Sequence, residues 1–128
     1  MRFILALITL LIQPAVAISS IDVHVDAKCP DKTIEYNIAN YAQNVVRKST
    51  IHKLVPGSNN AVMLISMSAA PVKQNGTADS TPLGISFAVL VRKKNSNGYW
   101  DVTSFQNYFI PIDEIEKTVQ NTIIEVLQ

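Results

Sequence analysis

The chain contains few of the residues on which enzymes and disulfide-bonded secreted proteins depend. Its 128 residues include one cysteine, two histidines and four glycines. The single cysteine, Cys29, excludes an intrachain disulfide, so we expect its thiol to be buried or, alternatively, bonded to another chain. The sequence has no Gly-rich phosphate loop, Gly-x-Ser-x-Gly elbow, His-Glu-x-x-His motif or paired-cysteine zinc motif. These absences predict a protein that is not an enzyme and that uses no cofactor.

The chain also has no hydrophobic run of the length that spans a membrane, which is about 20 residues. An apolar run, Phe3–Ile12, follows the basic pair Met1-Arg2 and precedes small residues that end at Ala17. This order is typical of a secretory signal peptide, so we predict a signal peptide over residues 1–17, cleaved after about Ala17, and a single domain over 18–128. An uncleaved anchor is the alternative. The lack of a disulfide framework favours a bacterial periplasm, and we expect a periplasmic or secreted protein without a stable membrane anchor.

Neither sign of charge is in excess. Arg2 is the only charged residue of the first 17, so its removal makes the 11 basic and 10 acidic side chains of the full chain equal in number. A neutral chain is poorly suited to nucleic acid or to an anionic membrane surface. A glycosylation sequon begins at Asn75, but it is an acceptor only in a eukaryotic host, and its Asn-Gly pair also fits a turn.

The spacing of apolar residues predicts two helices and four strands in the order β-α-β-β-β-α. One helix is predicted over 31–48 with Asp31 as its N-cap, and another over 113–128 with a capping box formed by Asp113 and Glu116. The strands are predicted over 20–26, 61–69, 83–91 and 99–110. Residues 49–54 fit either an extension of the first helix or a short strand.

These elements predict an α+β two-layer sandwich, in which both helices cover one face of an antiparallel β-meander. The large apolar residues of the last strand change parity along it, which predicts a β-bulge near Ser104-Phe105. Arg92-Lys93-Lys94 is interpreted as a solvated turn, with an anion site as the alternative. By its order of elements alone, the chain resembles small modules of bacterial envelope assembly and secretion machinery.

One strand carries a candidate metal site. Asp22, His24 and Asp26 alternate with apolar residues, so their side chains project from the same face of the strand. Two carboxylates and an imidazole could hold a divalent ion such as Zn²⁺. The alternative is a polar face that meets water, either on an open face of the sheet or on an edge strand whose charges discourage edge-to-edge pairing.

A second candidate surface is aromatic. Tyr99, Trp100 and Tyr108 lie on the last predicted strand, and a long polar loop, 71–82, precedes the central one. Aromatic side chains left over from core packing mark protein contacts. We therefore predict a non-catalytic protein-binding or accessory module of the cell envelope or secretion machinery, whose partner is another envelope or secreted protein. A metal- or small-ligand-binding protein that uses the Asp22/His24/Asp26 face is the alternative.

Overall fold

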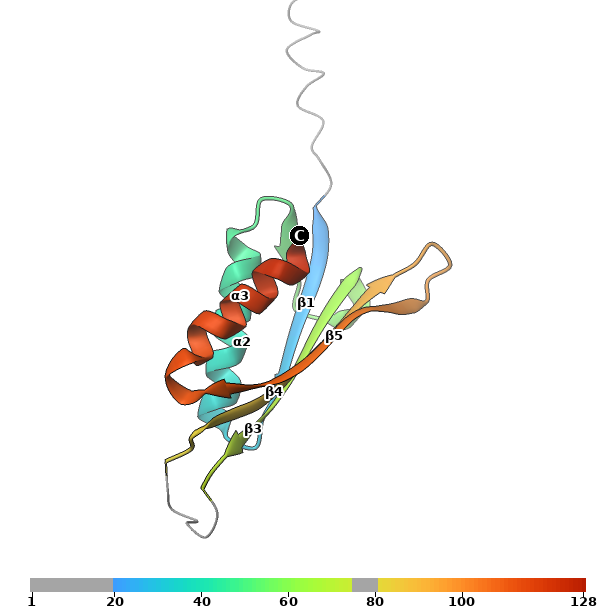
Figure 1. The fold of residues 1–128 in the computed structure, drawn as a ribbon. Helices are drawn as coiled ribbons and strands as arrows, with labels where there is room; N and C mark the ends of the chain where they lie inside the picture. Colours follow the sequence, from blue (N-terminus) through green and yellow to red (C-terminus); the bar gives the residue numbers. More distant parts are fainter. Residues whose placement is uncertain (1–19, 75–80) are drawn as a thin grey trace, which may run out of the picture.

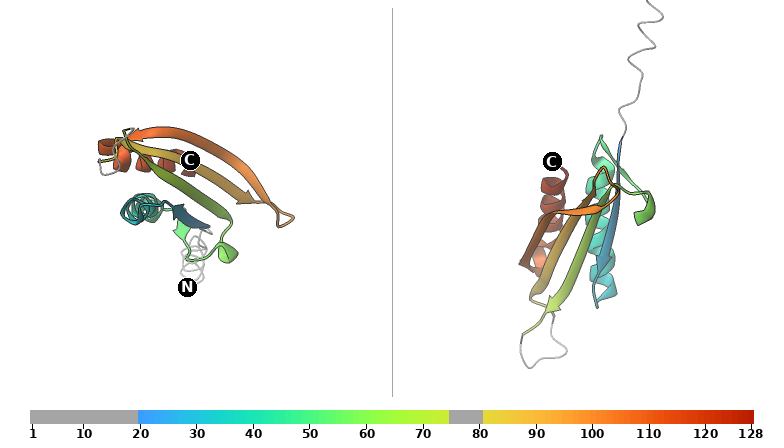
Figure 2. Two further views of the ribbon diagram at one scale, coloured as in Figure 1. Left: turned by 90° about the horizontal axis from the view of Figure 1, so that it is seen from below. Right: turned by 90° about the vertical axis from the view of Figure 1, so that its right-hand side faces the viewer.

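The computed structural model describes residues 20–74 and 81–128. The predicted signal peptide and the sequon at Asn75 lie outside these residues. The described chain forms an α+β structure in the predicted order, a five-stranded sheet with two helices on one side (Figures 1 and 2). The prediction of the fold class is confirmed, and the sheet differs from a pure meander because it is mixed. The strands are β1 (Ile21–Lys28), β2 (His52–Leu54), β3 (Met63–Val72), β4 (Gly84–Lys94) and β5 (Trp100–Pro111).

The sheet has the strand order β2-β1-β3-β4-β5. β3, β4 and β5 form the predicted antiparallel meander. β1 pairs in parallel with β2 on one side and with β3 on the other, so the interpretation of the first strand as an edge strand is wrong. The ambiguous segment 49–54 supplies β2, and this short strand is the edge. A strand that is internal to the sheet still has two faces. The alternation in β1 therefore separates apolar residues, which face the helices, from polar residues, which lie on the open face.

The first helix, α2 (Lys32–Lys48), begins where the sequence predicts. The side chain of Asp31 accepts hydrogen bonds from the backbone amides of Thr33 and Ile34, at 2.9 and 3.1 Å. Basic residues occupy its last turn, where the helix dipole favours positive charge.

The last helix starts differently from the prediction. A 3-10 turn, η3 (Ile112–Glu114), precedes α3 (Ile115–Leu127), and the N-cap residue Glu114 makes no side-chain capping bond. The predicted capping box of Asp113 and Glu116 is therefore wrong. Pro111 ends β5, and the backbone tightens into the 3-10 turn before it can adopt α-helical geometry.

The main core lies between the helices and one face of the sheet. Alternate residues of β1, β3 and β4 meet the apolar stripes of α2 and α3, as the two periodicities require. The largest fully buried side chains are those of Phe87, Ile38, Ile65, Ile85, Ile110 and Ile123. The opposite face carries no helix in the described part of the chain, and this open face contains the features that follow.

A β-bulge and a tight hairpin shape the β4–β5 ribbon. Between the pairs Val91–Ser104 and Arg92–Val102 the register shifts by one residue, so Thr103 is the extra residue of β5. The bulge predicted near Ser104 is confirmed. The hairpin that joins the strands projects away from the helices (Figure 1), and it turns at Gly98, whose φ of 84° suits glycine.

Candidate functional site

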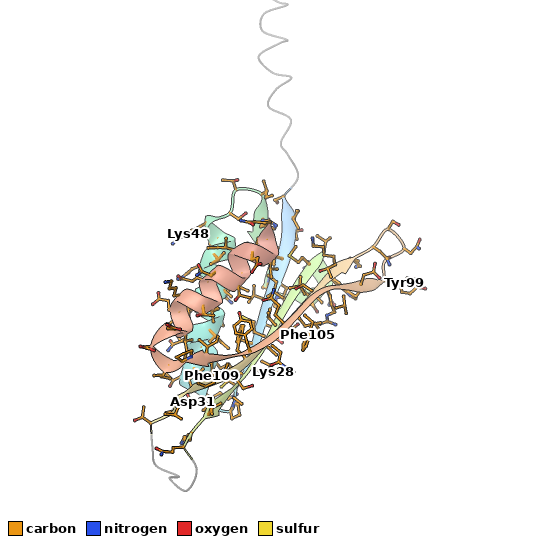
Figure 3. The ribbon with its side chains drawn as sticks, viewed as in Figure 1. Lys28, Asp31, Lys48, Tyr99, Phe105 and Phe109 are labelled. Carbon is orange, nitrogen blue, oxygen red and sulfur yellow. The ribbon has the colours of Figure 1, made fainter. Side chains whose placement is uncertain are left out.

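The open face of the sheet divides into an apolar part and a polar part. The apolar part lies on β5 and is formed by Val102, Phe105 and Phe109, which we call the β5 patch. These side chains are 62%, 62% and 51% exposed. Figure 3 shows Phe105 and Phe109 along β5. Apolar side chains that gather on one surface mark a contact site more often than single exposed ones do.

The bulge explains why this patch exists. Phe105 pairs with Leu90 and Val102 pairs with Arg92, and both partners lie on the open face. Odd- and even-numbered residues of a regular strand point to opposite faces. Because Thr103 is inserted between them, an odd and an even residue project to the same side. The patch thus depends on the bulge that leaves Thr103 out of the alternation.

Phe109 is held in place by a glycine. A Cβ atom added to Gly84 would lie 2.6 Å from the ring of Phe109 and 2.1 Å from the carbonyl oxygen of Ile110. The ring therefore lies over the bare backbone of Gly84, which explains why Phe109 is only half exposed. This contact fixes one end of the β5 patch against β4.

The three predicted contact aromatics are separated by the fold. Tyr99 lies in the hairpin and is 71% exposed (Figure 3). Trp100 is half-buried, and the ammonium group of Lys94 lies 5.6 Å from its ring centroid. Tyr108 faces the helices: it packs edge-on against Phe87 and hydrogen-bonds to Thr122. The assignment of Tyr108 to a contact surface is therefore corrected, since its ring belongs to the core.

The side chains of Asp22, His24 and Asp26 lie on the open face, as their alternation predicts. Among residues 20–74 and 81–128, no group of three His, Cys, Asp or Glu side chains is placed to hold a metal ion. His24 has another role, because its Nδ1 lies 3.0 Å from the carbonyl oxygen of Val55. A carbonyl can only accept, so Nδ1 carries the proton in this bond and Nε2 is the basic nitrogen of the neutral ring. The geometry gives the predicted metal site no support.

The polar part of the open face is a hollow of about 460 Å³. It is lined by Ser66, Arg92 and Trp100, among others, and by the first two residues of the 3-10 turn η2 (Ser58–Asn60). The segment that follows β2 reaches the open face here, where Val55 and Ala61 form a small apolar cluster with Leu64. The hollow is therefore built by four strands and one turn.

Cys29 is 4% exposed and unpaired, which confirms the prediction of a buried thiol. Burial raises the pKa of the Cys29 thiol, and the nearby Asp31 and Glu35 carboxylates add to the effect, against an opposing hydrogen bond. The Cys29 amide donates to Glu35 at 3.0 Å, and this bond lowers the pKa of Glu35, with help from Lys32. A thiol with a raised pKa is a poor nucleophile at neutral pH.

Sequence reasoning misplaces Tyr108, whose ring packs on the core, and favours a solvated turn over an anion site at Arg92. The parity change pointed to a bulge, and counting from Val102 across that bulge would have placed Phe105 on the same face. Arg92 does not belong to a solvated turn, because it lies within β4 and is half-buried. Its alternation with Leu90 was the signal that it belongs to the sheet face.

No protein-family model and no curated protein sequence matches this chain. Solved structures do share its fold. A PelC dodecamer from Paraburkholderia phytofirmans, in a single-substitution variant, is 17% identical, with a TM-score of 0.52 over 89% of this chain and 90% of that one. Protein XCC0632 from Xanthomonas campestris, of family model DUF330, is 7% identical with a TM-score of 0.54 over 86% and 82%. CT253 from Chlamydia trachomatis is 9% identical with a TM-score of 0.51 over 86% and 96%.

At these identities the likeness establishes the fold alone. The likeness extends over most of each chain. No helix within the described ranges has the length and apolar character needed to cross a membrane.

Proposed function

We propose that this protein is an exported, non-catalytic accessory module of the cell envelope, that it acts through protein–protein contact at the β5 patch, and that its partner there is a second copy of the same chain. The observation that carries the proposal is the exposure of Val102, Phe105 and Phe109 on a sheet face that no helix covers in the described chain. Such apolar exposure is costly in water and is removed by association.

The exposed area of the β5 patch is smaller than the area that a stable interface buries. Two phenylalanines that are 62% and 51% exposed present roughly 200 Å² of ring surface between them, if a full side chain counts for about 200 Å². A stable interface buries about 800 Å² on each partner. The β5 patch is therefore the apolar centre of a contact that must extend over more of the open face, which has the anatomy of an apolar core within a polar rim.

Three features favour a second copy as the occupant. The PelC protein that shares this fold is a dodecamer in its solved structure. Without the predicted signal peptide, the basic and acidic side chains balance, so copies do not repel one another by net charge. β5 is the last strand in the sheet order, and within the described residues its outer edge pairs with no strand, so an edge is free beside the patch.

The non-catalytic part of the proposal rests on different evidence. The sequence carries none of the common nucleophile, phosphate-loop or zinc motifs. The thiol of Cys29 is buried, and its raised pKa opposes formation of the reactive thiolate. Export rests on the signal-peptide pattern of residues 1–17.

Sedimentation equilibrium of the mature protein, purified from a bacterial periplasm, tests the proposal. We expect a concentration-dependent assembly that Phe105→Thr and Phe109→Thr each weaken by about tenfold or more, because each removes apolar area from the contact. Threonine keeps β-propensity, so the strand is retained. Tyr36→Thr is the matched control, since Tyr36 is 69% exposed but lies on α2.

Two results would contradict self-assembly. One is a wild-type protein that stays monomeric at all concentrations. The other is an assembly that both phenylalanine variants retain. A monomer that crosslinks in the native envelope to a different protein, in a manner that depends on Phe105, would instead support the original expectation of a heterologous partner.

A further inference from the structure

The side chains that line the polar hollow on the open face carry more positive than negative charge. Arg92 and Lys94 both line it, and Asp26 is the one carboxylate among the lining residues. The ion pair between Lys32 and Glu35 does not involve the hollow, because neither residue lines it. The hollow therefore carries a net positive charge that no residue within it pairs directly.

Arg92 is the clearest sign that an acceptor is needed. Its Nε is buried, and among the described residues no atom accepts a hydrogen bond from it. One terminal nitrogen of the guanidinium reaches the hydroxyl of Ser66, at a long 3.4 Å. Buried N–H groups of native proteins nearly always have an acceptor, and a charged donor without one is costly. The structure thus presents a guanidinium that is held by β4 but left with free donors.

The rest of the hollow narrows the chemistry of that acceptor. The guanidinium fork matches the two oxygens of a planar carboxylate. A dianion such as phosphate gains less here, because Asp26 brings a second negative charge into the same small volume. The ring of Trp100 and the side chain of Leu64 supply an apolar wall beside the charges.

We infer that this hollow is a binding site for a carboxylate, in which Arg92 forms the bidentate contact, Lys94 adds a second positive charge and Trp100 stacks against the apolar part of the ligand. His24 and Asp26 can accept hydrogen bonds from a donor group next to the carboxylate, since Nδ1 of His24 is already committed to Val55. The inference goes beyond the proposed assembly and does not depend on it, because the lining residues exclude all three members of the β5 patch.

The carboxylate could belong to a small organic acid or to the C-terminus of a peptide. Trp100 is the chain's one tryptophan, so its indole N–H gives a single, assignable NMR signal at the site. We expect acetate to shift this signal saturably, with a dissociation constant on the order of 1 mM. Inorganic phosphate at the same concentrations should bind at least several times more weakly.

Two variants of lining residues test the site, and a variant outside the hollow is the matched control. Arg92→Gln should weaken acetate binding by about tenfold or more, and Lys53→Gln, on the exposed part of edge strand β2 outside the hollow, should leave it unchanged. Lys94 is exposed, so Lys94→Gln should fold in any case and should weaken binding severalfold. If Arg92→Gln loses the native NMR spectrum, and is therefore unfolded, the acetate affinity of the Lys94→Gln variant tests the inference in its place.

A tripeptide with a free C-terminus, compared with its C-terminal amide, separates the two sources. Tighter binding of the free peptide than of acetate assigns the site to a chain terminus, and equal binding assigns it to a small acid; both results support the inference. Three results overturn it: an amide that binds as well as the free peptide, phosphate that binds as tightly as acetate, or a shift that is linear in acetate and identical in the Lys94 variant.

Discussion

A substitution at Gly84 connects the core of the sheet to its contact surface. Gly84 opens β4 opposite Pro111, and its φ is not positive, so alanine can adopt its backbone conformation. The obstacle is space. A Cβ atom at this position would lie 2.1 Å from the carbonyl oxygen of Ile110, where real contacts essentially never fall below 3.0 Å. Gly84→Ala therefore requires β5 to move away from β4 by about 1 Å.

The size of the effect follows from three contributions. Overpacking of a well-packed site costs about 1–3 kcal/mol. A weakened ladder hydrogen bond beside Gly84 adds about 1 kcal/mol. The lower entropy of an unfolded chain with alanine returns about 0.4–1 kcal/mol. We expect a net loss of about 2 kcal/mol in the free energy of unfolding, measured by urea denaturation with Trp100 fluorescence as the probe.

The matched control is Gly57→Ala. A Cβ atom at Gly57 meets nothing within 4 Å, and its φ of −134° suits any residue. This variant should gain up to about 0.5 kcal/mol through the unfolded state alone. Gly84→Ala should also weaken assembly, because the added methyl group displaces the Phe109 ring, 2.6 Å away. If the two alanine variants differ in stability by less than about 0.5 kcal/mol, the packing argument is refuted.

Three further predictions follow from the core. The Cys29 thiol should react with Ellman's reagent at neutral pH only slowly in the native protein and fully in denaturant, because it is buried and its pKa is raised; fast native labelling would contradict this. Burial, with the charge of Lys93, lowers the pKa of His52, so the unfolded state takes up a proton first as the pH falls. The contribution of His52 to stability should be constant above about pH 6.5 and should be lost as the pH drops from there to the lowered pKa, and His52→Asn should lack this slope. Tyr108→Phe should cost about 1 kcal/mol by removing the bond to Thr122, while assembly stays unchanged in sedimentation.

Much of the fold was predictable because its signals are local. The N-cap Asp31, the helical stripes and the alternating strands are each encoded within a few residues. The parallel pairing of β1 with β2 and β3 was not predictable, since it joins segments that are distant in sequence and since β2 has only three residues, His52–Leu54. Such a short strand forms because β1 supplies its hydrogen-bonding partners, not because of its own propensity.

The candidate site was harder to predict for a related reason. When the register of a strand shifts by one residue, every side chain beyond the shift turns to the other face of the sheet. The predicted bulge position was one residue beyond Thr103, and no contact distance can be read from a sequence to correct it. From the sequence alone, Tyr108 is therefore as suitable a contact residue as Phe105, although the ring of Tyr108 packs on the core and that of Phe105 is exposed. The unpaired state of Arg92 depends on which charges surround it in space.

The bulge at Thr103 is what joins the two parts of the open face. If the same residues paired with β4 without a bulge, the alternation that places Phe105 on the open side would turn Val102 and Trp100 toward the helix side. The β5 patch would then lose one of its three members, and the hollow would lose its aromatic wall. Bulges are found where a strand must redirect a side chain. In this sheet, the bulge keeps the residues on both sides of Thr103 on the open face, so the contact surface and the carboxylate site depend on the same local geometry.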